Sequence, residues 1–507
     1  MSVFLILLTV TTFVYLPFFA NPALLLNRNN DLTEFFWPIF YYLKQNILVN
    51  HQIPFWNNMF FAGTPLLPDP QNPIWYLPNA IFLFTDINTG IIISLFLHTL
   101  FGSIGMYIAS RKVFKFSSLI SLMVSGIFTL SPIYFSYLEA GHCGLAISWT
   151  WMPYLLLSTY QLGNKPTPKN VFLFAISASS MYFNHVVTAL IAIAPAVVYW
   201  LYKKSIRYPT VALLLALVTI SPALILQLSW LPNTTRQILL AYPETFPIWR
   251  GKREYIRTVF LFNPETEKAI TFGIVPTILA LYGFIKLKRK LKLFLILPAI
   301  LLLLIVLNNV SPILPLLLKI DFFVLMRVTT RVWFLIFFIL LFSFGYALEK
   351  LNKYMTVALG FLALVESTLI GYSYFVKPIS ARENIPVVIY NILESDKTNF
   401  RVFCLSRCIP QKEAALRNLH LVEGYGTLPE KNYFYVLGEA LNTRWDKYSL
   451  SVPPFEAYLY QKLQPNAKLL RAFNTKYVIS KYPLNDTNFV FWEKFDEYYL
   501  YLNKLWF

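Results

Sequence analysis

Residues 209–229 read PTVALLLALVTISPALILQLS, a stretch without a charged side chain. A helix of about 20 apolar residues crosses the roughly 30 Å hydrocarbon core of a bilayer. Stretches of this kind recur from residue 3 to residue 374, so the sequence predicts a helical protein that crosses the membrane many times. We expect about eleven transmembrane helices, at residues 3–20, 89–109, 117–137, 143–161, 171–185, 186–202, 209–229, 270–286, 291–308, 332–348 and 354–376.

The composition excludes an ordinary soluble protein and a disordered one. Of the 507 residues, 57% are hydrophobic and only 13% are charged, against about 25% in typical soluble domains. The mean hydropathy is +0.53. A net charge of +18 would suggest nucleic acid as a partner of a soluble protein, but much of it lies in short loops between apolar stretches. We therefore expect membrane lipids and no nucleic acid as partners.

These basic loops predict the orientation of the chain. Five of them carry 15 Lys or Arg and one acid in 33 residues, whereas the opposing loop 21–79 has only Arg28 and Lys44. The positive-inside rule places the basic loops in the cytoplasm, the N-terminus inside and the C-terminus outside. The first apolar segment lacks a basic n-region and a cleavage site, so we expect a retained span of a multi-pass protein of the cytoplasmic membrane. The five loops are 111–116, 162–170, 203–208, 286–292 and 349–353.

The last quarter of the chain has a different composition. Residues 377–507 carry 17 basic and 13 acidic side chains in mixed segments such as KYVISKY. Their number suits an independent core. We expect a transmembrane domain at 1–376 and an extracytoplasmic α/β domain at 377–507. Three cysteines form no disulfide framework, although Cys404 and Cys408 could make one bridge on an oxidising side.

The first external loop, 21–79, is unusually long for a connection between spans. Its 59 residues include twelve aromatic residues, eight prolines and three acids, Asp31, Glu34 and Asp69. A simple linker would be more polar. The aromatic residues predict interfacial helices that hold the acids just above the lipid headgroups.

The stretch 30–82, NDLTEFFWPIFYYLKQNILVNHQIPFWNNMFFAGTPLLPDPQNPIWYLPNAIF, resembles the opening of the YfhO-like membrane proteins. That family belongs to the GT-C superfamily of glycosyltransferases, which use polyprenyl-phosphate sugars. One departure is Asn30, where the family often has Gly. The resembling elements are an early acid (Asp31), a Trp-Asn turn (Gln52 to Asn57), a Gly-x-Pro turn (Phe61 to Pro65), an acid-x-Gln (Asp69 to Gln71), Gly141-His142 with Trp151 to Pro153, Arg327 to Arg331, and Leu469 to Tyr482.

The resemblance implies inverting transfer of a sugar from a polyprenyl-phosphate carrier to a glycan, lipid or protein acceptor on the outer face. Asp31 is then the catalytic base. Phosphate leaves without being protonated, but the acceptor hydroxyl loses its proton as it attacks, so one positioned carboxylate suffices. The alternative for Asp31 is a helix N-cap with Glu34 as its partner, because Asp31-Leu-Thr-Glu34 fits a capping box.

Other residues, Glu34 among them, are expected to bind the substrates. Asp69 and Gln71 could bind sugar hydroxyls or a divalent ion, or Asp69 could only support its turn between Pro68 and Pro70. Since the donor carries one phosphate, we expect no metal and no cofactor. His142 could orient donor or acceptor, or form a hydrogen bond between helices. Glu366 lies within a span, where we favour a structural role.

Arginine side chains are expected to hold the phosphate, because their planar fork matches its oxygens. One candidate pair is Arg327 with Arg331, which share a face if they are helical. The other candidates, together with Lys252, form a cluster that could equally be a solvated loop near anionic headgroups. They are Arg250, Arg253 and Arg257.

Two other classes of function compete with the enzyme. A lipid-linked-sugar transporter or flippase explains poorly the long aromatic loop and the large terminal domain. A membrane scaffold in an envelope assembly would keep the GT-C fold without its chemistry. An oligosaccharyltransferase is disfavoured because the W-W-D-Y-G string of that family is absent from the tail.

Overall fold

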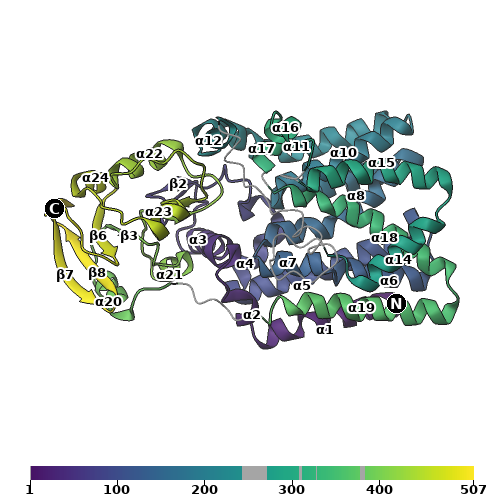
Figure 1. Cartoon of the computed structure of the whole chain (residues 1–507), viewed down its shortest axis with the longest axis horizontal. Helices are drawn as coiled ribbons and strands as arrows, with labels where there is room; N and C mark the ends of the chain where they lie inside the picture. Colours follow the sequence, from purple (N-terminus) through teal and green to yellow (C-terminus); the bar gives the residue numbers. More distant parts are fainter. Residues whose placement is uncertain (1, 242–270, 308–310, 327, 377–382, 507) are drawn as a thin grey trace. The chain divides into compact units, whose positions relative to one another are not determined.

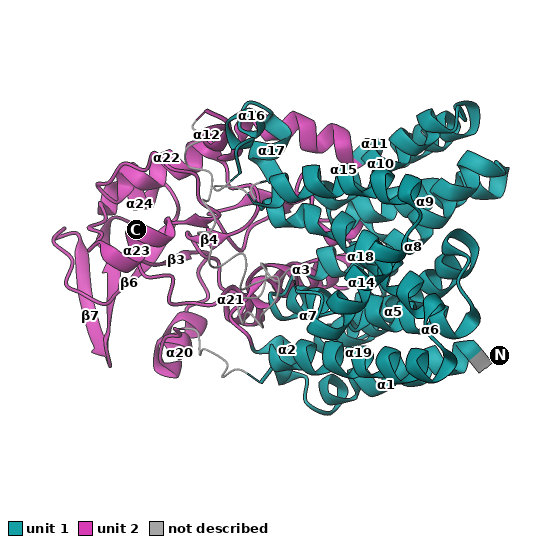
Figure 2. Ribbon diagram, turned by 45° about the vertical axis from the view of Figure 1, so that its right-hand side comes forward, with its two compact units in different colours: residues 1–27, 75–222, 247–378 teal, residues 28–74, 223–246, 379–507 magenta. Residues whose placement is uncertain are grey.

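A computed structural model describes residues 2–241, 271–307, 311–326, 328–376 and 383–506 (Figure 1). The chain forms two compact units, and each of them is built from three separate stretches of sequence (Figure 2). The helical unit comprises residues 1–27, 75–222 and 247–378. The mixed unit comprises residues 28–74, 223–246 and 379–507, so most of the first loop belongs to the same unit as the C-terminal residues.

Each apolar stretch predicted to span the membrane forms a helix or a pair of helices. Among the described residues, six helices are long and apolar enough to cross a bilayer, and α10 and α14 are shorter apolar helices. The polytopic α-helical fold is thereby confirmed. The predicted spans correspond to twelve helices among the described residues: α1 (Ser2–Ala20), α5 (Ile87–Ala109), α6 (Ser118–Thr129), α7 (Pro132–Glu139), α8 (Cys143–Asn164), α9 (Pro168–Asn184), α10 (Val186–Tyr202), α11 (Arg207–Trp230), α14 (Ile274–Lys286), α15 (Arg289–Val306), α18 (Trp333–Lys350) and α19 (Lys353–Ser373).

Two breaks in these helices have local causes. The stretch 117–137 divides into α6 and α7 because Pro132 starts a new helix, and the hydroxyl of Ser131 caps it by accepting the N–H of Tyr134 (3.3 Å). The stretch 171–202 contains two helices that meet at His185, as predicted. Shorter helices complete the unit: α2 (Ala23–Leu26), η2 (Pro73–Trp75) at its boundary, η3 (Leu77–Ala80), α4 (Ile81–Phe84), η4 (Ser110–Phe114), α16 (Leu314–Leu317), α17 (Asp321–Met326) and η8 (Thr329–Val332).

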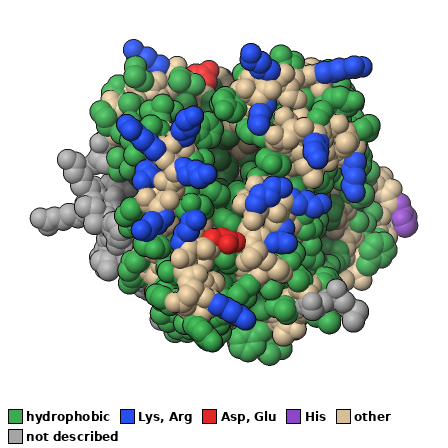
Figure 3. Space-filling view, turned by 90° about the vertical axis from the view of Figure 1, so that its right-hand side faces the viewer, with side chains coloured by type: hydrophobic (Ala, Val, Ile, Leu, Met, Phe, Trp, Pro, Cys, Tyr) green, Lys and Arg blue, Asp and Glu red, His purple; other side chains and the backbone are tan. Residues whose placement is uncertain are grey.

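The basic loops connect helix ends of the helical unit. They follow α5, α8, α10, α14 and α18. On the end face drawn in Figure 3, Lys and Arg side chains gather with few acids between them. This is the charge asymmetry on which the predicted cytoplasmic placement depends.

Two ionisable side chains inside the helical unit, Glu366 and His98, form hydrogen bonds to other elements. The two carboxylate oxygens of Glu366 accept the N–H groups of Ile274 (2.7 Å) and Val275 (2.8 Å). Glu366 therefore caps the positive end of α14, which confirms its structural role. His98 forms a 2.7 Å hydrogen bond through Nε2 with the hydroxyl of Tyr76.

A four-stranded mixed sheet organises the C-terminal part of the mixed unit, in the order β3-β6-β8-β7. β3 (Arg401–Cys404) is parallel to β6 (Thr475–Ser480), while β8 (Tyr498–Asn503) is antiparallel to both β6 and β7 (Phe489–Phe495). All six residues of β6 are buried, as expected for a central strand. The predicted α/β architecture is confirmed by the helices around this sheet: α20 (Val387–Ser395), α21 (Gln411–Leu416), α22 (Lys431–Ala440), α23 (Phe455–Tyr460), α24 (Ala467–Arg471) and η9 (Lys504–Trp506).

The first loop shares the core of this unit. Helix α3 contacts α21, and the ammonium group of Lys412 lies 5.2 Å from the ring centre of Trp37. The remaining elements are short: η1 (Leu32–Phe36), α3 (Trp37–Leu48), β1 (Trp56–Asn57), β2 (Thr64–Pro65), η5 (Leu231–Asn233), α12 (Arg236–Ala241), β4 (Gly424–Tyr425) and β5 (Ser451–Val452).

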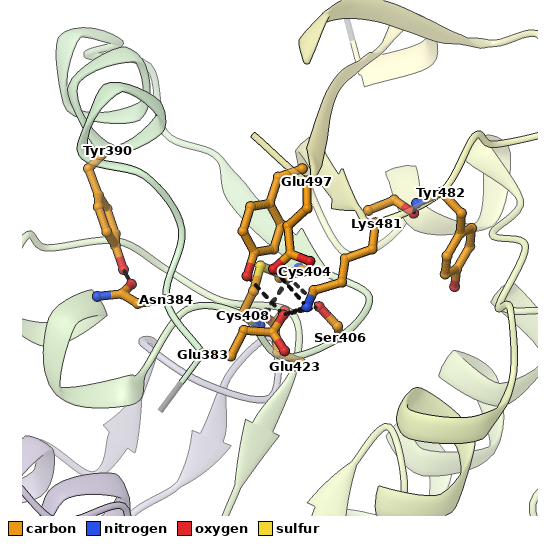
Figure 4. The surroundings of a disulfide bond; sticks show 12 residues. Glu383, Asn384, Tyr390, Cys404, Ser406, Cys408, Glu423, Lys481, Tyr482 and Glu497 are labelled. Carbon is orange, nitrogen blue, oxygen red and sulfur yellow. Dashed lines mark hydrogen bonds and ion pairs between the residues drawn. A yellow bond between two sulfur atoms is a disulfide. The ribbon is translucent and has the colours of Figure 1, made fainter. Parts of the chain in front are cut away.

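A disulfide joins Cys404 at the end of β3 to Cys408, which confirms the bridge expected from the sequence (Figure 4). Beside it, the carboxylate of Glu383 accepts the hydroxyl of Ser406 (2.9 Å) and lies 3.1 Å from Lys481 Nζ. Tyr498 donates its hydroxyl to the same Glu383 oxygen (3.0 Å). These contacts hold the short disulfide loop against β6 and β8.

Candidate active site in the mixed unit

Two of the motifs in the first loop form one small hairpin. In the antiparallel pair β1–β2, Trp56 lies opposite Pro65 and Asn57 opposite Thr64. Gly63 has φ +108°, and a Cβ placed there would lie 2.5 Å from the indole nitrogen of Trp56. The Trp-Asn turn and the Gly-x-Pro turn are therefore packed on each other, and the contact requires glycine.

The tip of this hairpin is strained. Phe61 and Ala62, which precede Gly63, also have left-handed backbones, with φ of +59° and +54°. This conformation is higher in energy for residues other than glycine, and it persists where surrounding contacts impose it. Here the N–H groups of Phe61 and Ala62 donate to the carbonyls of Glu423 (3.1 Å) and Leu421 (3.2 Å).

Those carbonyls belong to residues 421–428, which we call the bridging segment. Gly424 lies against the ring of Phe61, since an added Cβ would be 2.7 Å from it. The N–H of Leu421 returns a hydrogen bond to the carbonyl of Met59 (2.7 Å). Backbone bonds in both directions thus fix the first loop to the bridging segment.

The bridging segment also holds two of the predicted acids. The hydroxyl of Tyr425 donates to Asp31 Oδ1 at 2.8 Å, and the hydroxyl of Thr427 donates to Asp69 Oδ2 at 2.6 Å. The other oxygen of Asp69 accepts the N–H of Gln71 (2.8 Å). Each carboxylate is thereby oriented by a neutral hydroxyl.

The helix cap expected of Asp31 comes from its neighbour. Asn30 Oδ1 accepts the N–H groups of Leu32 (3.1 Å) and Thr33 (3.4 Å) at the start of η1. The carboxylate of Asp31 makes no such capping bond. Asn30, which departs from the resembling family, performs the capping role, and the half-buried Asp31 is directed to Tyr425.

Glu34, expected either as a cap partner or as a substrate-binding acid, lies in a buried ion pair. Its Oε2 is 3.7 Å from Arg407 Nη2, and both side chains are only 8% exposed. The amide of Gln411 donates to the carbonyl of Glu34, and Gln411 Oε1 accepts the N–H of Tyr425 (2.6 Å). The guanidinium of Arg407 lies 5.6 Å from the ring centre of Tyr425. Glu34 therefore belongs to the support of Tyr425.

Asp69 has the perturbed titration typical of functional sites. Burial raises the pKa of its carboxyl, and the hydrogen bonds from Thr427 and Gln71 and the charge of Arg236 oppose part of that rise. Arg236 donates through Nε to the carbonyl of Thr427 (3.3 Å), and its guanidinium lies 4.9 Å from the ring centre of Tyr448.

A small cavity of about 30 Å³ lies beside Asp69, and its lining includes Tyr425, Thr427 and Phe61. That space suits one or two water molecules and is too small for a sugar ring. Any sugar must therefore bind outside it. Among the described residues, no three His, Cys, Asp or Glu side chains come together as a metal site.

The other predicted site residues lie elsewhere. In the helical unit, His142 and Arg331 are close enough to act electrostatically on His185. Arg331 donates to the carbonyl of Met326 (3.4 Å). Val328 has an extended backbone, and the short helix that contains Arg331 starts at Thr329. Arg331 therefore does not share a continuous helix with residue 327, as the predicted pair required. The remaining arginines lie outside the described residues: Arg250, Arg253, Arg257 and Arg327.

Comparison with solved structures decides the fold. The arabinofuranosyltransferase AftD from Mycobacteria aligns over 96% of this chain with a TM-score of 0.58 and 15% identity. The chain shares the fold of this enzyme. It spans only 35% of that enzyme's length. A mutant of the same enzyme gives a TM-score of 0.56 at 16% identity, over 96% of this chain and 37% of the enzyme. No protein-family profile and no curated protein matches this chain.

Sequence reasoning missed the partners of the acids. They are distant in sequence, and a tyrosine or threonine carries little signal of its own. The glycines that flank Tyr425 were the available sign, because glycine in a strand often marks close approach of another backbone. The missed residues are Arg236, Arg407, Gln411, Tyr425 and Thr427.

Proposed function

We propose that this chain is a membrane glycosyltransferase that moves a sugar, with inversion, from a polyprenyl-phosphate carrier to a glycan, lipid or protein acceptor outside the cytoplasm. Asp31 is the catalytic base. Asp69 and Gln71 bind sugar hydroxyls, His142 orients the donor or the acceptor, and the arginines at 250, 253, 257, 327 and 331 are the candidates for the donor phosphate.

The chemistry needs few groups. The attacking hydroxyl of the acceptor gives its proton to a carboxylate as the new glycosidic bond forms, while the phosphate departs with the electrons of the broken bond. A base that is already oriented avoids the cost of ordering it during the reaction. The 2.8 Å hydrogen bond from Tyr425 gives Asp31 that orientation.

One observation carries the proposal. Asp31 and Asp69 are 38 positions apart, yet both are held by hydroxyls of residues 425 and 427 in the same bridging segment. A scaffold has no need for two acids held in this way, and the helix beside Asp31 is capped by Asn30 instead. The GT-C fold is consistent with this chemistry.

The test is transfer by the purified full chain in lipid nanodiscs. Undecaprenyl-phosphate sugars serve as donors, membranes from cells lacking the gene supply the acceptor, and released undecaprenyl phosphate is measured. Asp31→Asn should reduce release at least about a thousandfold, within the range of general-base effects, while the melting temperature changes little.

A matched control is Asp86→Asn. Asp86 also lies at the start of a helix, but its carboxylate caps α5 by accepting the N–H of Thr89 (3.0 Å). This change should alter stability little, because Asn caps a helix about as well as Asp does, and it should leave the rate of release unchanged. Normal release by Asp31→Asn would remove Asp31 from the mechanism.

A further inference from the structure

A second and larger depression lies in the mixed unit, where α20 and α21 end. Its volume is about 790 Å³, and it is lined by Leu393, Glu394, the residues from Asp396 to Phe400, Glu413 and the residues from Leu416 to His420. We call it the α20–α21 pocket. Its size falls within the range of about 300–1,000 Å³ that is usual for ligand sites. None of the residues assigned above to the transfer reaction lines it.

The charges of this pocket are already paired within the protein. Arg417 lies 2.5 Å from Glu394 through Nη1 and 3.6 Å from Glu413 through Nε. Asp396 lies 2.6 Å from Lys476 Nζ. Three carboxylates thus face two cations that they already contact. An ionic ligand would have to compete with these pairs.

The backbone also disfavours an anion. Helices α20 and α21 both present their C-terminal ends at the pocket, at Ser395 and Leu416. The end of a helix carries partial negative charge and carbonyl oxygens without helical partners. Such an end repels phosphate or carboxylate groups but accepts hydrogen bonds from hydroxyl groups.

The remaining charged side chain of the lining, Lys397, donates from Nζ to the carbonyl of Glu394 (2.8 Å). The other polar side chains are neutral and can both donate and accept. Asn399 and Asn418 are exposed amides. Burial, with the nearby charge of Arg401, lowers the pKa of His420, so its ring is neutral at pH 7 and offers one donor and one acceptor. The side chain of Leu416 is 48% exposed and adds an apolar surface.

We propose that the α20–α21 pocket binds a neutral oligosaccharide. Sugar hydroxyls both donate and accept hydrogen bonds, which matches the amides and the imidazole, and the C–H faces of a sugar ring match Leu416. The inference concerns binding alone and does not depend on Asp31 as the catalytic base.

The experiment uses the full chain in nanodiscs on a printed array of neutral, sulfated and carboxylated oligosaccharides, followed by titration with the best neutral probe. Asn399→Trp places a large side chain at an exposed position and should weaken binding at least about tenfold by filling the pocket. His420→Ala should weaken it by a similar factor by removing a donor and an acceptor. Asn391→Trp is the control, because Asn391 is exposed on α20 but does not line the pocket.

The expected result is binding of neutral glycans that Asn399→Trp and His420→Ala reduce and that Asn391→Trp and Asp31→Asn leave intact. Binding of anionic glycans only, equal binding by all variants, or no binding on the array would each overturn the inference. Loss of transfer in Asp31→Asn with intact glycan binding separates the two proposals.

Discussion

The hydrogen bond between Tyr425 and Asp31 allows a quantitative test of the proposed base. Tyr425→Phe removes one oxygen atom and keeps the ring, so the contact with Arg407 at 5.6 Å is preserved. The lost bond joins a hydroxyl to a carboxylate at 2.8 Å. Hydrogen bonds to charged groups are worth about 1.5–3 kcal/mol.

If that energy orients Asp31 for the reaction, transfer slows by about tenfold to hundredfold, because each 1.4 kcal/mol or so is a factor of ten in rate. Release of undecaprenyl phosphate from the nanodisc sample, at saturating donor, measures the change in kcat. Tyr498→Phe is the matched control, since it also removes a tyrosine hydroxyl that donates to a carboxylate, that of Glu383 at 3.0 Å. Its rate should equal that of the unmodified chain. A full rate for Tyr425→Phe, or equal losses in both variants, would refute the role of this bond.

Three further predictions concern the same unit. Burial raises the pKa of Asp69 in the folded protein. The neutral carboxyl therefore stabilises the fold at pH values below its ordinary pKa near 3.8, and this contribution is lost as the pH rises through the raised pKa. Asp69→Asn should therefore raise the melting temperature at pH 7 and flatten its pH dependence, and an unchanged pH profile would contradict this. Glu34→Gln removes the charge that faces buried Arg407 and should cost about 3 kcal/mol in chemical unfolding; the further change Arg407→Gln should recover part of the loss, and additive losses would exclude the pair. Cys404→Ser with Cys408→Ser opens a loop of sequence separation 4 and should cost about 2 kcal/mol by loop entropy, as measured by thermal unfolding with and without reductant; equal melting temperatures would argue against a formed bridge.

Much of the helical fold was predictable because a helix that crosses a membrane needs a long apolar stretch, which can be recognised in the sequence. The break at His185 and the structural role of Glu366 followed from short helix length and from the cost of an ionised group within a span. The break at Ser131 was missed, although Pro132 supplied the signal. Local rules were sufficient in each of these places.

The candidate site was predictable only in part. Asp31 and Asp69 stood out because acids are rare in an aromatic loop, but their orientation depends on Tyr425 and Thr427, which lie more than 350 positions away. The capping box in the sequence suggested Asp31 as the helix cap, but Asn30 is the residue that caps the helix. Both residue types are good caps, and only tertiary contacts decide between them. Glu34 forms an ion pair with Arg407. Arg407 is distant in sequence, so no local pattern could have indicated this partner.

The separation in sequence between Asp31 and Tyr425, which donates its hydroxyl to Asp31, has a consequence for the nascent chain. The two residues are separated by 394 positions, and a ribosome adding about 5–20 residues per second needs roughly 20–80 s to make that much chain. For that time the acid exists without the tyrosine that orients it. The proposed enzyme therefore reaches its full rate only after Tyr425 has been made, because a shorter nascent chain has the acid without the hydrogen bond that orients it.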